Sequence, residues 1–251
     1  MQIKGTVSYD FEILANVEAI FLDAKSMEFN KVLLDGKEMK FDYDGNKIIL
    51  KKKFKKGKEH SLYLEYDSNP KQTVYFMNWH IPDSLLKRMN GNHGTKVYDA
   101  LLKSMSTKVL RLMNHGNGQI WTQGQGKYTS HWLPSLDDMT DKVEFDLSLV
   151  FRNDYTVISN GKLIDKEERI GEAKWKFDMQ QPMSSYLVGF AIGNFDKQVL
   201  KSTSGVPIEL YFKPKDSSKV EPTYRYTQHI FDFLEKEIGV PYPWQNYKQV
   251  P

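Results

Sequence analysis

Two glutamine side chains separated by a single glycine form the clearest candidate for ligand binding in this 251-residue sequence. Gln123 and Gln125 flank Gly124. In an extended chain, residues two apart point to the same side, and each amide group can both donate and accept a hydrogen bond. The pair could therefore bind the backbone of a peptide. An edge strand that exposes two amides to solvent is the other interpretation that this spacing allows.

The sequence contains no complete metal-dependent or nucleophilic active site. A helical zinc site of a hydrolase needs two histidines four residues apart, with a glutamate beside the first. None of the six histidines forms such a pair, and His229 has the apolar neighbours Ile230 and Phe231. Cysteine is absent, which excludes a thiol nucleophile and a cysteine-ligated metal. We therefore predict no catalytic residue and no metal ligand in this chain.

Other reaction classes lack their sequence patterns as well. The Gly-x-Ser-x-Gly pattern of many serine hydrolases is absent. The glycines at 116, 118, 124 and 126 do not form a phosphate-binding loop, because no Lys-Ser or Lys-Thr pair directly follows them and Gly-x-Gly-x-x-Gly is not intact. Asp137 and Asp138 are adjacent acids, which we interpret as solvated loop residues. The glutamine pair remains the only candidate site.

Charge and hydropathy argue against several classes of partner. With 35 basic and 32 acidic residues, the formal net charge is only +3, which gives no general attraction to nucleic acid or membrane surfaces. The lysine-rich run at 51–58 is interpreted as a solvated hairpin tip, because it lacks stacking aromatic residues. No run of about 18 apolar residues and no apolar signal-peptide core occurs. We expect a soluble chain without a signal peptide, cytoplasmic or, in a full-length form, exported.

The residues that precede the glutamine pair alternate as β-strands do. From Ile3 to Ile13, apolar side chains recur with a period of two, which places them on one face of a strand. Turn sequences such as Asp35-Gly36 separate further short strands, as in an antiparallel meander. The predicted strands are Ile3–Ile13, Glu18–Leu22, Lys31–Leu34, Glu38–Phe41, Lys47–Leu50, Ser61–Tyr66 and Thr73–Phe76.

A second block of strands follows the glutamine pair. Here too, turns and not helices join the strands, so the sequence predicts a mainly β fold with antiparallel sheets packed as a sandwich or saddle. The predicted strands are Val143–Val150, Thr156–Ser159, Lys162–Asp165, Ala173–Met179, Tyr186–Ile192 and Ile208–Phe212.

Two segments have helical periodicity instead. Within residues 81–118 an apolar side chain recurs at about four-residue steps, at Val97, Leu101, Met105, Val109 and Leu112. The second helix is predicted from Ser218 to Ile238, where Ser218 and Glu221 resemble a capping box and Gly239 ends the pattern. Its apolar stripe needs a partner surface and consists of Tyr226, Ile230, Phe233, Leu234 and Ile238. We expect a domain boundary near Asp216.

Several motifs in a fixed order resemble the N-terminal domain of aminopeptidase N-type zinc metallopeptidases, the gluzincins that include leukotriene hydrolase-like proteins. The resemblance extends over Ile3–Trp79 and Gln119–Pro251. Its motifs are QIWTQGQG at 119–126, WLPSLD at 132–137, KVEFDLSL at 142–149, VISNGKL at 157–163, MSSYLVGFAIGNF at 183–195 and GVPYPWQNY at 239–247.

The resemblance implies a β-saddle domain at 1–215 that lends one loop to the substrate cleft of a zinc peptidase. Gln125 would bind the substrate near its first residue, and Gln123 and Gly124 would belong to the same loop. Residues 216–251 would begin the catalytic domain. Zinc is the cofactor of the full-length family, and the partner is a peptide N-terminus. The zinc ligands would lie beyond Pro251, so we expect a truncated chain that is inactive alone.

Residues 81–118 depart from this family, which has only a short connection there. We expect a helical insertion, which could contact another protein. Two further interpretations stay open. One is a stand-alone peptide-binding or regulatory module that kept the β-saddle, and the other is a structural or interaction domain of a larger assembly.

Overall fold

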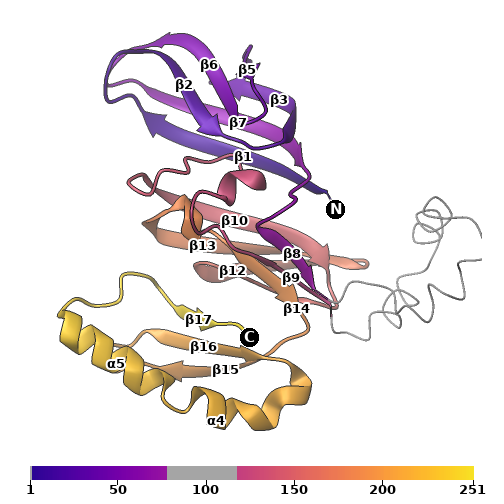
Figure 1. Ribbon diagram of the computed structural model, residues 1–251, viewed down its shortest axis with the longest axis vertical. Helices are drawn as coiled ribbons and strands as arrows, with labels where there is room; N and C mark the ends of the chain where they lie inside the picture. Colours follow the sequence, from indigo (N-terminus) through magenta and orange to yellow (C-terminus); the bar gives the residue numbers. More distant parts are fainter. Residues whose placement is uncertain (1, 78–117) are drawn as a thin grey trace, which may run out of the picture. The chain divides into compact units, whose positions relative to one another are not determined.

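The computed structural model describes residues 2–77 and 118–251, whose path is drawn in Figure 1. The predicted helical insertion at 81–118, with its apolar repeat from Val97 to Leu112, lies outside these residues except for Gly118. The chain divides into two compact units.

The first unit contains two antiparallel sheets, to which residues 122–143 and 183–189 are added. One sheet has the order β1 (Ile3–Glu12), β7 (Glu59–Ser68), β3 (Met27–Leu34) and β4 (Lys37–Glu38). The other has the order β2 (Val17–Asp23), β6 (Lys47–Phe54) and β5 (Asp42–Tyr43). Both sheets contribute to one hydrophobic core, in which Leu50 and Leu64 are fully buried. Each such side chain stabilises the fold by about 1.5–3 kcal/mol.

The alternation in the sequence sets the register of this unit. Val7 lies opposite Leu64 in the antiparallel pair of β1 and β7. One predicted strand, Glu38–Phe41, is wrong, because only Glu38 lies in a strand, β4, and residues 39–41 connect β4 to β5. β4 pairs with β3, whereas β5 pairs with β6 in the other sheet, so the chain changes sheets at this point.

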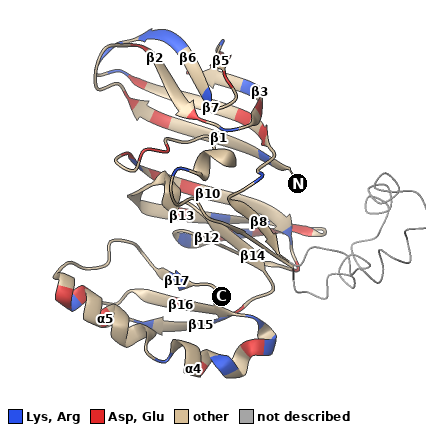
Figure 2. Cartoon of the chain, viewed as in Figure 1, with Lys and Arg blue, Asp and Glu red and all other residues tan. Residues whose placement is uncertain are grey.

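The lysine-rich run covers the end of β6 and the turn before β7 (Figure 2), but it is not the predicted hairpin tip, because β6 and β7 lie in different sheets. Two of its lysines pair with carboxylates on the surface: Lys51 with Asp42 at 2.5 Å and Lys52 with Asp35 at 3.7 Å. Exposed ion pairs of this kind contribute about 0–1 kcal/mol each, so the run adds little to stability.

The second unit holds three sheets, formed by the strands that follow the glutamine pair together with β8 and β9, which precede it. The first sheet has the order β10 (Lys142–Arg152), β13 (Glu172–Ser184), β12 (Lys162–Arg169). The second has the order β11 (Thr156–Ser159), β14 (Phe190–Gly193), β9 (Gln119–Thr122), β8 (Val74–Met77). The third has the order β15 (Asp196–Lys201), β16 (Pro207–Phe212), β17 (Tyr247–Gln249). β17 pairs with β16 in parallel, whereas the pairs β11–β14, β12–β13, β14–β9 and β15–β16 are antiparallel. The fold is mainly β, which confirms the predicted class.

The predicted strand Tyr186–Ile192 is correct only at its end. Ser185–Leu187 forms a short 3-10 helix, η2, because the carbonyl of Ser185 accepts a hydrogen bond from the N–H of Val188 at 2.9 Å. Three strands of this unit, β9, β15 and β17, coincide with no predicted strand. All but one of the β15 side chains are exposed, so this strand has no alternating apolar pattern, and β17 has only three residues.

The predicted C-terminal helix is present but interrupted. A 3-10 helix, η3 (Pro214–Lys219), leads into α4 (Val220–Tyr224), and α5 (Thr227–Ile238) follows. The capping box is wrong, because Ser218 lies within η3 and no side chain caps α4. Gly239 ends α5 with φ 72°, as predicted.

α5 packs on the third sheet of its unit through Phe231, which is buried with Ile208 and Leu210. The predicted apolar stripe points away from this cluster. Its side chains are all exposed: Tyr226, Ile230, Phe233, Leu234 and Ile238. Among the described residues, no helix has the length and apolar character that crossing a membrane requires.

Candidate functional site

The glutamine pair lies in a loop that directly follows β9, residues 123–128, which we call the glutamine loop. β9 is an interior strand, flanked by β14 and β8. The N–H of Gln123 donates to the carbonyl of Thr73 at 2.9 Å, and the N–H of Tyr128 donates to the carbonyl of Gly124 at 3.2 Å. The first bond attaches the start of the loop to Thr73, and the second closes the turn within the loop.

Both glutamine side chains are exposed, whereas Gly124 between them is buried. Gln123 continues beyond the end of β9, but Gln125 already begins a turn, so strand geometry does not align the two amides. Within residues 2–77 and 118–251, neither glutamine side chain has a hydrogen-bond partner. The two amides are thus free to bind a ligand. Their role as substrate contacts stays a prediction.

Gly124 fits its position because it has no side chain. A Cβ atom at Gly124 would lie 2.6 Å from the carbonyl oxygen of Tyr186, and it would also collide with the hydroxyl of Thr129. That hydroxyl is completely buried and donates to the carbonyl of Ser185 at 2.9 Å. The glycine therefore allows the loop to lie directly against η2.

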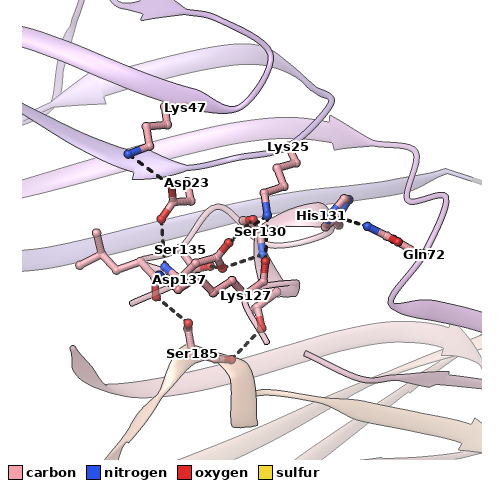
Figure 3. A network of polar contacts seen from close by, with 12 residues as sticks. Asp23, Lys25, Lys47, Gln72, Lys127, Ser130, His131, Ser135, Asp137 and Ser185 are labelled. Atoms are coloured by element: carbon pink, nitrogen blue, oxygen red, sulfur yellow. Dashed lines mark hydrogen bonds and ion pairs between the residues drawn. The ribbon is translucent and has the colours of Figure 1, made fainter. Parts of the chain in front are cut away.

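A buried carboxylate organises the residues that follow the loop (Figure 3). Asp137 is only 4% exposed. It accepts hydrogen bonds from the backbone N–H of Ser130 at 3.2 Å and from the Ser130 hydroxyl at 2.6 Å. The Ser135 hydroxyl also donates to it at 3.5 Å, and the ammonium of Lys25 lies 3.5 Å away. Our interpretation of Asp137 as a solvated acid is wrong, since the fold surrounds it with donors, although its neighbour Asp138 is exposed.

The same segment is tied to the N-terminal sheets by hydrogen bonds to its backbone. The Tyr66 hydroxyl donates to the carbonyl of Trp132 at 3.0 Å. Burial raises the pKa of Tyr66, so this hydroxyl stays protonated and able to donate at neutral pH. Asp23 and Ser135 exchange two backbone hydrogen bonds at 2.8 and 2.9 Å. The segment that carries the glutamine loop is thus fixed to the core of its own unit.

His131 lies beside this network, in surroundings that favour its neutral form. Its Nε2 lies 3.1 Å from the amide nitrogen of Gln72, which can donate to an unprotonated ring nitrogen. Burial lowers the pKa of His131, and the nearby Lys25 lowers it further, while Asp137 acts in the opposite direction.

We expect this lowered pKa to make stability depend on pH. In the unfolded chain the pKa is about 6.5, so below this pH the unfolded state binds more protons than the folded state. The contribution is fully present above about pH 6.5 and is lost as the pH falls through the lower folded pKa. The test compares urea midpoints of the wild type and His131→Gln between pH 5 and 7.5. Equal pH slopes for the two proteins would contradict the prediction.

Sequence reasoning found the loop but missed the residues that support it. Asp137 belongs to the motif WLPSLD, which identified the segment but did not indicate that this side chain is buried. Lys25 and Thr73 had no sequence signal. Among the residues that the structure describes, no cluster of three or more histidine, aspartate or glutamate side chains is placed to hold a metal ion.

Comparisons with known proteins bear on the family of the chain. The family profile described as "Peptidase M1 N-terminal domain" matches residues 1–187. Glutamyl aminopeptidase of Bos taurus is 31% identical over 112 residues, which are 44% of this chain and 12% of that protein. Probable aminopeptidase 1 of Saccharolobus solfataricus is 25% identical over 239 residues, or 93% of this chain and 26% of that protein.

Solved structures extend the likeness to the fold of nearly the whole chain. The crystal structure of an M1 zinc metallopeptidase from Deinococcus radiodurans matches 98% of this chain with a TM-score of 0.73 and 15% identity. The match covers 51% of that structure, so this chain spans about half of its length. It spans still less of the two curated relatives.

Proposed function

This chain belongs to the peptidase M1 N-terminal domain family, and from that premise we propose that it binds substrate for a zinc aminopeptidase. In the complete protein it would form the wall of the cleft that receives the N-terminus of a peptide. The observation that carries this proposal is the glutamine loop, which exposes two unpaired amides on a backbone attached to Thr73 and closed by a hydrogen bond of its own.

The chemistry of the loop suits a peptide ligand. Each amide offers two N–H donors and one carbonyl acceptor, which match the groups of a peptide backbone. Because the loop is already ordered, little conformational entropy is lost when a substrate binds. We assign the main contact to Gln125, with Gln123 and Gly124 shaping the same part of the cleft.

The chain is proposed to be inactive by itself. The described residues do not fit a zinc site, since they bring no set of metal ligands together. In the complete protein, zinc bound elsewhere would activate the water that attacks the first peptide bond. This chain would hold the peptide in place. Purified alone, it is expected to release no product from an aminoacyl-amide substrate with added zinc. Hydrolysis that a chelator abolishes would overturn this part of the proposal.

We further propose that residues 216–251 begin the catalytic domain. The apolar stripe of α5 supports this, because five of its large side chains are exposed although its other side is packed. Exposed apolar surface of this extent usually marks an interface. Reading the gene past the codon for Pro251 tests the assignment: Gly-x-Met-Glu-Asn and His-Glu-x-x-His motifs should follow in frame, and a stop codon there would favour a stand-alone binding module.

Gln125→Ala tests the loop directly in the complete polypeptide that the gene encodes. Loss of one hydrogen bond to the substrate is worth about 1–1.5 kcal/mol, so KM for an aminoacyl-amide substrate should rise about tenfold. The matched control is Gln198→Ala, which removes an exposed amide from β15. A KM for Gln125→Ala equal to that of the control would contradict substrate contact by this residue.

A further inference from the structure

The turn of the glutamine loop has an unfavourable backbone conformation. Lys127 has φ 98° and follows Gly126 at φ 93°. Positive φ is sterically unfavourable for a side chain such as that of lysine and persists only where other contacts impose it. Thr73, which accepts the hydrogen bond from Gln123 at the other end of the loop, also has positive φ, at 74°. Positive φ thus occurs both within the turn and at the residue to which the start of the loop is bonded.

One side chain contacts the strained turn, and its contacts explain how the backbone conformation of the turn is maintained. The ammonium of Lys25 donates to the carbonyl of Lys127 at 2.8 Å and lies 5.7 Å from the centre of the Tyr128 ring. Figure 3 shows it between the turn and the buried Asp137, with which it pairs at 3.5 Å. The side chain of Lys25 is 29% exposed, so its charge is partly shielded from water.

The backbone of Lys25 is itself fixed. Its N–H donates to the carbonyl of Ser130 at 2.7 Å. Ser130 is completely buried and carries both hydrogen bonds to Asp137. The ammonium therefore extends from a rigid position, and the distance from Lys25 to the turn is set by the core.

We propose that Lys25 is a positioning residue for the glutamine loop: its ammonium holds the carbonyl of Lys127 and so keeps the strained turn that presents Gln125. The effect of Lys25 on substrate binding rests on the proposed function, in which Gln125 is the substrate contact. Lys25 itself touches no substrate. Without its ammonium, the turn would relax toward negative φ, and Gln125 would lose its fixed place.

Amide hydrogen exchange in this chain tests the structural part of the proposal. The reporter is the N–H of Tyr128, which is protected from exchange by its hydrogen bond to the carbonyl of Gly124. In Lys25→Met its exchange should accelerate about tenfold, the effect of losing one charge-assisted hydrogen bond. The matched control is Lys52→Met, which removes an ammonium with a carboxylate at 3.7 Å and a ring at 5.6 Å, far from the loop. Equal exchange of Tyr128 in both variants would overturn the proposal.

A double-mutant cycle separates the strained turn from the ion pair with Asp137. Lys127→Gly places a glycine where φ is positive and removes the strain, while the carbonyl remains. If Lys25 acts on the turn, Lys25→Met should accelerate exchange much less in the Lys127→Gly background than in the wild type. An undiminished acceleration would show that Lys25 acts only through Asp137, and the positioning role would be wrong.

Kinetics of the complete polypeptide distinguish this inference from the proposed function. Lys25→Met should raise KM for an aminoacyl-amide substrate about as much as Gln125→Ala does and leave kcat within about twofold, because only ground-state positioning is lost. Faster Tyr128 exchange with an unchanged KM would uphold Lys25 as the support of the turn and refute substrate binding by the loop. Unchanged exchange would refute the role of Lys25 whatever the KM.

Discussion

Gly124→Ala is expected to expel the glutamine loop from its position and to lower the free energy of unfolding by about 1–3 kcal/mol. The added methyl group would lie 2.6 Å from the carbonyl oxygen of Tyr186, far closer than carbon and oxygen atoms approach without bonding. That carbonyl belongs to η2, whose Ser185 hydroxyl is fixed to the carbonyl of Leu136 at 2.6 Å. Because η2 cannot easily retreat, the loop must move. Urea denaturation and the NMR signals of Gln123 and Gln125 measure the two effects.

Gly45→Ala is the matched control for this substitution. A methyl group at Gly45 meets no atom within 4 Å, but its φ of 88° is unfavourable for alanine. The control is expected to cost about 1 kcal/mol and to leave the NMR signals of the glutamine loop in place. If Gly124→Ala also left these signals unchanged, the close approach of the loop to η2 would be disproved.

Asp137→Ala is expected to lower the free energy of unfolding by about 2–4 kcal/mol, because it leaves two buried donors of Ser130 without an acceptor. The backbone N–H and hydroxyl of Ser130 are both directed at this carboxylate, and Ser130 has no exposure to water. The ammonium of Lys25 also loses its partner, but it is 29% exposed and can be hydrated in part, which limits the cost. Thermal or urea denaturation measures the change.

Asp138→Ala separates the role of burial from that of acidity. Asp138 is exposed, and its carboxylate accepts hydrogen bonds from the backbone and hydroxyl of Thr140 at 3.0 and 2.9 Å. Removing these bonds should cost about 1 kcal/mol at most, since water replaces them. Comparable destabilisation by the two substitutions would show that Asp137 does not organise the segment.

The strands that alternate strongly were predictable because one face of each is buried. β1 was expected at Ile3–Ile13 and occurs at Ile3–Glu12, and β11 occurs at the expected residues, Thr156–Ser159. Where this alternation is missing, pairing with a neighbouring strand of the sheet decides whether a strand forms. β15 is exposed over most of its length and forms because β16 pairs with all six of its residues. No local pattern of apolar residues announces such a strand.

In the C-terminal helix, too, local features were predictable and tertiary contacts were not. The apolar stripe and the stop at Gly239 are local properties, and both were read correctly. The break between α4 and α5 was not predicted, because Ser218 and Glu221 offered a capping pattern that the chain does not use. The residue that attaches α5 to its sheet is Phe231, which lies outside the predicted stripe. Which face of a helix is covered depends on the surfaces it meets.

The sequence by itself determined the β class of the fold, its family and the place of Gln123, Gly124 and Gln125, because strand periodicity and motif order are written in adjacent residues. Only the tertiary structure decided what supports that loop. Lys25 and Asp137 are 112 positions apart, yet their charges meet at 3.5 Å. Burial distinguishes Asp137 from Asp138, and burial is a property of packing that neighbouring residues in a sequence do not reveal. The glutamine amides are local in sequence, but their fixed position is a product of the fold.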